Sequence, residues 1–149
     1  MIVPWIAQPS PDGVKPASWR IRLLVRLASH EGISHAGFLD SILDTGAHWT
    51  TFTEDHAPAA GIDDITTGPA TSVQWLGVNH AAWLHRLRLT IAIDPRQSDT
   101  VTPDAFDVLF IRRFPHARTK KLLSFAVLGM DCLRHLQLTL DGPAAATRF

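Results

Sequence analysis

A strict alternation of apolar and polar side chains constrains the fold of this chain more than any other feature of its sequence. In residues 19–27, Arg20, Arg22 and Arg26 occupy alternate positions opposite large apolar residues, and residues 83–93 repeat the pattern. Successive side chains of a strand point to opposite faces, so a period of two predicts half-buried strands. With the shorter apolar segments between turn residues, we expect about seven or eight strands in an all-β, closed domain.

The distribution of proline and glycine predicts where the domain begins and ends. The 149 residues are 46% hydrophobic and 19% charged, which fits one folded domain with a real core. Four prolines and a glycine fall within residues 1–16, so we expect an irregular, flexible lead-in there. The domain is then expected over residues 17–142, and residues 143–149 form a small, polar tail.

Charge and cysteine content narrow the expected partners and compartment. The formal net charge is zero, so no global field draws the chain to nucleic acid or to an anionic membrane. The N-terminus lacks the positive and long apolar regions of a signal peptide, and no apolar run approaches the roughly 20 residues of a membrane helix. Cys132 is the one cysteine, so no internal disulfide can form. We expect a cytoplasmic protein that binds neither nucleic acid nor membrane.

A short motif in the first third of the chain carries the strongest chemical signal. An apolar, strand-like run ends at Asp44, and Thr45, Gly46 and Ala47 follow directly. A glycine two residues after the aspartate leaves its backbone N–H free to point at the carboxylate and lets two backbones approach closely. The tripeptide alone is also ordinary turn chemistry, so a strand that ends in a turn is the alternative interpretation.

Two downstream elements make the motif more specific. The apolar-apolar-glycine segment at 127–129 precedes a short amphipathic turn in which Asp131 is expected to be the N-cap. Residues 75–89 form a predicted hairpin with its tip at 77–80, where Gly77 and Asn79 suit turn positions. In this order, over about residues 19–141, the elements resemble the retropepsin family of aspartic proteases, including its bacterial single-domain members.

The resemblance implies a fold and a mechanism. It implies a retropepsin-like acid protease fold: a closed β domain with a flap hairpin and one short C-terminal helix. Asp44, Thr45 and Gly46 would be the catalytic residues of an aspartic endopeptidase, and Thr45 would tie two aspartate loops together. The chain has one Asp-Thr-Gly motif, so the second carboxylate must come from a second copy, in a homodimer with Asp44 on the two-fold axis. No metal and no cofactor is needed.

The resemblance also implies a substrate, and some positions of this chain differ from the family's pattern. A peptide or protein substrate would lie in an extended cleft lined by Ala47, Trp49, Gly77, Val78, Phe125 and Val127. Plain core packing remains equally open for Phe125 and Val127. His48 and Met130 stand where the viral members have a paired aspartate and arginine. Asn79 and His80 replace small residues in the expected flap tip, so a non-catalytic peptide-binding or dimerisation module is the alternative function.

The remaining reactive and charged residues favour structural explanations. The eight histidines show no His-Glu-x-x-His pattern and no Cys/His pair with zinc-finger spacing. Cys132 is expected to be a buried thiol, because no neighbouring residue in the sequence would activate it. A basic cluster stands out, and it is interpreted first as a solvated loop, with an acidic substrate region, RNA or a membrane face as alternatives. It comprises Arg112, Arg113, His116, Arg118, Lys120 and Lys121.

Overall fold

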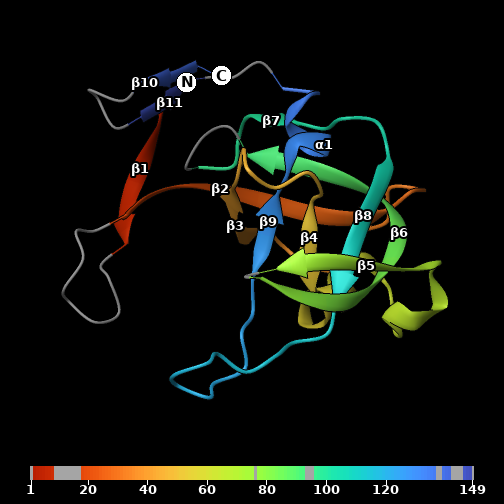
Figure 1. Ribbon diagram of the computed structural model, residues 1–149. Helices are drawn as coiled ribbons and strands as arrows, with labels where there is room; N and C mark the ends of the chain where they lie inside the picture. The colour runs from red at the N-terminus through yellow and green to blue at the C-terminus, as the bar shows by residue number, and fades with distance from the viewer. Residues whose placement is uncertain are drawn as a thin grey trace.

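The computed structural model describes residues 2–8, 18–75, 77–92, 96–136, 139–141 and 146–148 (Figure 1). Within these residues it contains eleven strands and short helices. The strands are β1 Ile2–Gln8, β2 Ser18–Ser29, β3 Leu39–Leu43, β4 Thr51–Thr53, β5 Ala70–Trp75, β6 Val78–Ala92, β7 Thr100–Val101, β8 Phe106–Ile111, β9 Ala126–Leu128, β10 Thr139–Asp141 and β11 Ala146–Arg148. The helices are the 3-10 turns η1 Glu54–Ala60 and η2 Ile65–Thr67 and the α-helix α1 Met130–Leu133.

The strands close into a barrel, as the alternating pattern predicts. Among the described residues the hydrogen-bonded order runs β2-β3-β9-β4-β8-β6, and β6 pairs back to β2. This closed ring leaves no open edge among its six members. The pairing of β9 with β3 is parallel, whereas its pairing with β4 is antiparallel. Strand β9 therefore runs between two strands that come almost directly after each other in the chain.

The core lies inside this ring. Val25 and Leu27 of β2 and Leu89 and Ile91 of β6 have no exposed surface, whereas Arg26 and Arg88 on the opposite faces are exposed. The face predicted for each long strand is thus confirmed. Phe52 of β4 is also fully buried and packs with its ring centroid 5.7 Å from that of Phe110.

Both ends of the chain differ from the expectation of irregular backbone. Strand β1 pairs with β2 and with β11, where Pro4 lies opposite Ala146, and β10 pairs with β11 (Figure 1). A proline lacks one hydrogen-bond donor, but its fixed φ fits an extended backbone, so it does not prevent a strand. Residues 9–16 of the expected lead-in and residues 143–145 of the expected tail lie outside the described residues. Strands β1 and β11 at the ends of the chain and the two-residue strand β7 are additional to the expected strands.

Two further boundaries differ from the predictions. Trp75 pairs with Val78, so the hairpin turn falls two residues earlier than predicted, and Asn79 and His80 lie inside β6 rather than at the tip. Gly77 has φ +78°, the left-handed conformation that glycine adopts most easily. The apolar run at 122–128 forms a strand only from Ala126.

Within the described residues no helix is long and apolar enough to cross a membrane.

Candidate active site

Asp44 lies at the point where β3 ends, and β9 holds it there. The backbone N–H of Asp44 donates to the carbonyl of Leu128 at 3.0 Å, which continues the parallel pairing of β3 with β9 by one residue. The apolar-apolar-glycine segment at 127–129 is therefore adjacent to the aspartate motif. Because β9 also pairs with β4, one strand positions both arms of the loop between Leu43 and Thr51.

The aspartate loop is closed by its own backbone. The N–H of Gly46 donates to Oδ1 of Asp44 at 2.9 Å, which is the hydrogen bond expected from the motif, and the N–H of Ala47 donates to the carbonyl of Asp44 at 3.2 Å. Asp44 is half-buried, whereas Thr45 and Gly46 are exposed. The carboxylate is thus fixed on one side by protein and open on the other.

Gly129 lets the two motifs approach each other. A Cβ atom added at this position would lie 2.5 Å from the carbonyl carbon of Trp49 and 2.9 Å from the carbonyl oxygen of Ala47. Real Cβ atoms do not approach so closely, so any side chain here would displace the backbone that follows the aspartate loop. The residue after it, Met130, donates its N–H to the carbonyl of Ala47 at 2.8 Å.

The sequence did not predict the role of Asp131. Gly129, not Asp131, is the N-cap of α1, and Asp131 lies within the first turn. Its Oδ1 accepts the N–H of Thr50 at 2.8 Å and the Thr50 hydroxyl at 2.7 Å. Thr50 is fully buried, and its hydroxyl oxygen accepts the N–H of Gly129 at 3.1 Å. The partners are about 80 residues apart in the chain, so no local pattern could indicate this contact.

A groove of about 510 Å³ opens directly above the aspartate loop. One side is formed by the loop and the residues after it, and the other by β5 of the β5–β6 hairpin. Its lining residues are Asp44, Gly46, Ala47, His48, Trp49, Thr51, Ser72, Val73, Gln74 and Trp75. Of the residues predicted to contact substrate, Ala47 and Trp49 line this groove, and Trp49 keeps 49% of its surface exposed.

The other predicted substrate contacts have different surroundings. Gly77 and Val78 are exposed at the hairpin end, where Val78 keeps 56% of its surface exposed. Phe125 is half-buried and stacks on Trp75 with ring centroids 4.7 Å apart, so it supports a residue of the groove. Val127 is 3% exposed and pairs with Ile42 and Thr51, so the core-packing interpretation describes its position in this chain.

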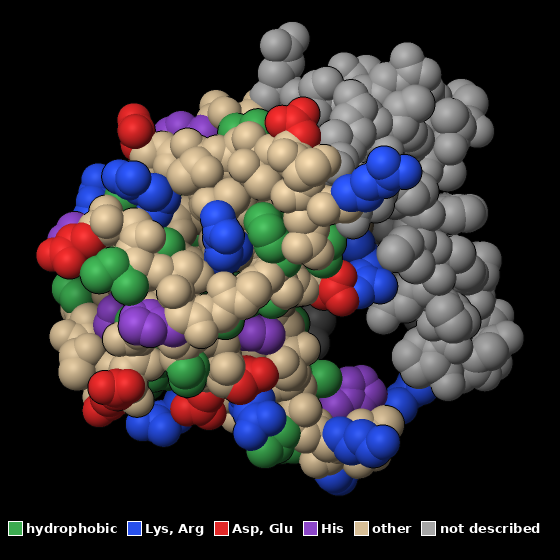
Figure 2. Space-filling view, turned by 180° about the vertical axis from the view of Figure 1, so that it is seen from behind, with side chains coloured by type: hydrophobic (Ala, Val, Ile, Leu, Met, Phe, Trp, Pro, Cys, Tyr) green, Lys and Arg blue, Asp and Glu red, His purple; other side chains and the backbone are tan. Residues whose placement is uncertain are grey.

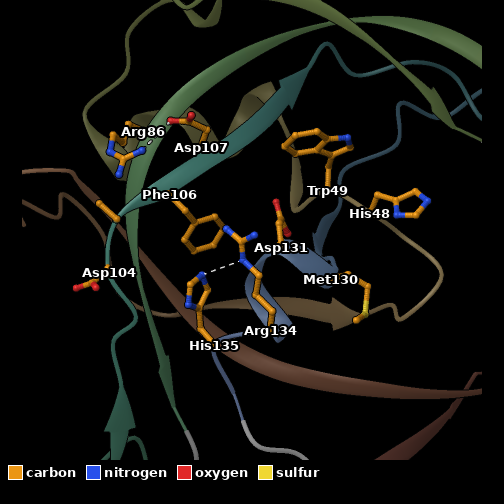
Figure 3. A pocket seen from close by; sticks show the side chains of 11 residues that line it. His48, Trp49, Arg86, Asp104, Phe106, Asp107, Met130, Asp131, Arg134 and His135 are labelled. Atoms are coloured by element: carbon orange, nitrogen blue, oxygen red, sulfur yellow. Dashed lines mark hydrogen bonds and ion pairs between the residues drawn. The ribbon is translucent and has the colours of Figure 1, made fainter.

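A second groove of about 780 Å³ adjoins the first (Figure 3). His48 and Trp49 line both, so the two grooves meet at these side chains. Figure 3 shows Arg134, the C-cap residue of α1, beside His135, with a hydrogen bond of 3.3 Å between their side chains. The exposed side chain of Met130 faces the same space. The polar groups of this groove are of mixed charge, with Arg86 paired to Asp107 at 3.4 Å.

Metal-ligand and thiol chemistry have little support among the described residues. No three side chains from His, Cys, Asp and Glu gather there as a metal site would require. Cys132 is fully buried, as predicted, and burial together with the nearby charge of Asp131 raises the pKa of its thiol to about 12. A thiol with so high a pKa is protonated at neutral pH and is a poor nucleophile.

Comparison with solved structures identifies the fold. No family model and no curated protein matches the sequence. The structure is similar to the crystal structure of a retropepsin-like aspartic protease from Rickettsia conorii, with a TM-score of 0.54 and 15% sequence identity, over 95% of this chain and 92% of that chain. The fold is retropepsin-like. EIAV protease complexed with the inhibitor HBY-793 is also similar, with a TM-score of 0.44 and 18% identity, over 77% of this chain and 86% of that chain.

The retropepsin-like fold confirms the architecture predicted from the order of the motifs. In the part of the chain that the structure describes, one short α-helix, α1, follows the strands of the closed ring and begins directly after Gly129. Within this fold, the chain brings its Asp-Thr-Gly loop and its β5–β6 hairpin to the two sides of one groove.

Proposed function

We propose that this protein is a homodimeric aspartic endopeptidase that hydrolyses peptide bonds. The observation that carries the proposal is the position of Asp44. Its carboxylate is held by the N–H of Gly46, and it opens onto the groove between the aspartate loop and β5. A carboxylate oriented by a backbone N–H and facing a groove of about 510 Å³ suits acid–base catalysis of peptide hydrolysis.

A second copy of the chain supplies the second carboxylate in this proposal. Thr45 and Gly46 are exposed in the single chain, so the aspartate loop can meet its symmetry mate face to face. Two Asp44 carboxylates about 3 Å apart would not both ionise, so the pair would share one proton. The charged member takes a proton from water as the water attacks the peptide carbonyl, and the neutral member donates to the carbonyl oxygen. The Thr45 hydroxyl ties the two loops together.

The substrate in this proposal is an extended peptide held between the loop and the β5–β6 hairpin, which acts as the flap. Ala47 forms the floor, Trp49 an apolar wall, and Gly77 and Val78 the exposed end of the flap. Phe125 acts through Trp75, which it stacks against. The peptide backbone would pair with strand-like backbone in the groove, as in other β-strand additions. Reaction through water and two carboxylates involves no cofactor. The free thiol of Cys132 fits a reducing compartment, so we place the enzyme in the cytoplasm.

The direct test is cleavage of a peptide library by the wild-type protein and by Asp44→Asn. The variant keeps the size of the side chain but removes the titrating carboxylate, so cleavage should be abolished while the dimer persists. Asp63→Asn, at an exposed position outside the groove, is the matched control and should cleave normally. Undiminished cleavage by Asp44→Asn would refute the proposal. Peptide binding by the wild type without turnover at any concentration would favour the alternative, a non-catalytic peptide-binding or dimerisation module.

A further inference from the structure

The connection between β8 and β9 is the most strongly basic part of the chain. Residues 112–125, here called the basic hairpin, contain five of the 14 lysines and arginines and no aspartate or glutamate. These cations are Arg112, Arg113, Arg118, Lys120 and Lys121. The catalytic proposal gives this segment no role. Arg112 pairs with Glu54 of η1 at 3.6 Å, whereas Lys120 and Lys121 near the turn are exposed.

The basic hairpin has a defined backbone structure. Pro115 and Leu122 form a β-bridge, and the N–H of Leu123 donates to the carbonyl of Phe114 at 2.9 Å. At its turn, Nδ1 of His116 accepts the backbone N–H groups of Arg118 and Thr119 at 3.3 and 3.2 Å. These contacts order the backbone that carries the cations, which reduces the backbone entropy lost when an anionic partner binds.

Aromatic contacts join the basic hairpin to the wall of the catalytic groove. Phe125 stacks on Trp75 with an interplanar angle of 11°, and Trp75 lines the groove. Phe114 packs against His80 of β6 with ring centroids 4.2 Å apart. The basic hairpin projects beyond the β5–β6 hairpin in Figure 1, and in the reversed view of Figure 2 Lys and Arg side chains gather at that lower edge of the molecule. A peptide that leaves the groove past Trp75 would therefore meet the cations.

We propose that the basic hairpin binds acidic residues of the substrate, on the segment that flanks the residues held in the groove. This inference rests on the proposed function and specifies its substrate class: proteins cut beside an acidic stretch. An extended chain advances about 3.3 Å per residue, so Lys120 lies up to about 16 Å along the hairpin from Phe125. The preferred acidic residues of the substrate then lie within about five residues of the substrate residue that contacts Trp75, on the side where the peptide leaves the groove. Leu122, which is 54% exposed, adds an apolar contact beside the cations.

The same aromatic contacts argue for a peptide over a nucleic acid. Binding of single-stranded nucleic acid uses exposed aromatic rings on which bases stack. The aromatic residues of the basic hairpin, Phe114 and Phe125, are half-buried and packed against each other and against Trp75 and His80. What the hairpin exposes is positive charge without a stacking surface, which suits carboxylates.

The test compares two peptides with the same cleaved centre, one flanked by Asp and Glu and the other by Asn and Gln. At low salt the wild type should cleave the acidic peptide with a kcat/KM about 3- to 10-fold higher, and the preference should shrink as salt screens the charges. Lys120→Gln/Lys121→Gln should lose the preference and still cleave the neutral peptide. Arg88→Gln/Arg96→Gln, which removes the same charge at other exposed positions, should keep it.

The outcomes separate this inference from the catalytic proposal. Equal cleavage of both peptides by the wild type would overturn the inference and leave the catalytic proposal standing. If no peptide is cleaved, the catalytic proposal fails, and binding of the labelled acidic peptide decides the inference. Loss of this binding in the Lys120→Gln/Lys121→Gln variant alone supports the inference. Unchanged binding in that variant overturns the inference. Loss of binding to an RNA oligonucleotide or to anionic vesicles, with acidic-peptide behaviour unchanged, would assign the hairpin to that other partner and overturn the inference.

Discussion

The carboxylate of Asp131 accepts both the backbone N–H and the hydroxyl of Thr50, at 2.8 and 2.7 Å. The same hydroxyl oxygen accepts the N–H of Gly129. These hydrogen bonds link the start of α1, the end of β9 and the segment after the aspartate loop at one fully buried threonine. Thr50 has no access to water, so its N–H and hydroxyl depend on Asp131 and Gly129 for their hydrogen bonds.

Replacing Thr50 by valine should destabilise the protein by about 1–3 kcal/mol, because it leaves the N–H of Gly129 without its acceptor and removes one donor to Asp131. Denaturant unfolding measures this loss. Thr50→Ser retains the hydroxyl and removes only a methyl group, so it should cost less than the valine variant. Equal losses for valine and serine would show that packing, not hydrogen bonding, explains the burial of Thr50.

A side chain at Gly129 should be poorly tolerated. Gly129→Ala places a Cβ atom 2.5 Å from the backbone of Trp49, so we expect a loss of about 1–3 kcal/mol or more in stability, with loss of cleavage. Gly37→Ala is the matched control, since a Cβ atom there meets nothing within 4 Å. If the two variants are equally stable and active, the close approach of β9 to the aspartate loop is not required.

These contacts show what the sequence can and cannot predict. The alternation in β2 and β6 predicts their buried faces because a strand's side-chain period depends only on local geometry. The Asp44 loop and the segment ending at Gly129 are each short and contiguous, so the resemblance to the retropepsin family could be stated on them, and that resemblance implied that they belong together. The partner of Asp131 was missed because a carboxylate near a helix start is usually a cap, and only tertiary structure brings Thr50 to it.

Boundaries were the weakest part of the prediction. The tip of the β5–β6 hairpin was predicted at residues 77–80, because Gly77 and Asn79 suit turn positions. In the structure His80 instead packs on Phe114, and the pairing of Trp75 with Val78 sets the turn at Gly77. The contact of His80 with Phe114 of the basic hairpin goes together with the observed register of β5 and β6. Local turn preferences alone did not indicate this register.

The stacking of Trp75 on Phe125 should couple the β5–β6 hairpin to the basic hairpin. We expect a double-mutant cycle with Trp75→Leu and Phe125→Leu to give a coupling of about 0.5–1.5 kcal/mol in unfolding free energy, the usual value for an aromatic pair beyond its buried area. Hydrogen exchange should rise in β5 in each single variant. Additive effects of the two substitutions would mean that the rings touch without holding the hairpin.

Stability should fall in mild acid because of His56 and Asp55. Burial lowers the pKa of His56, partly offset by the charge of Asp55. Burial raises the pKa of Asp55, but the hydrogen bonds from Ser124 and Thr53 and the charge of His56 outweigh it, so that this pKa is also lowered.

Both groups therefore bind protons more readily in the unfolded chain. Stability is lost first as the pH falls below 6.5, the ordinary value for histidine, and further below 3.8, the ordinary value for Asp55. His56→Gln should flatten the decline in unfolding free energy between about pH 7 and about pH 5. His30→Gln, at a side chain 64% exposed, should not. An unchanged slope in His56→Gln would contradict the assignment.

The central claim is that each active site takes one Asp44 from each of two chains. The most direct measurement adds increasing amounts of inactive Asp44→Asn protein to a fixed amount of wild type, at concentrations where both are dimeric, and follows cleavage of one peptide. If the site is shared, subunit exchange produces mixed dimers without a complete pair, and cleavage should fall to about half at equal amounts of the two proteins. If cleavage stays at the wild-type level throughout the titration, the chain does not need a second Asp44, and the proposed mechanism is wrong.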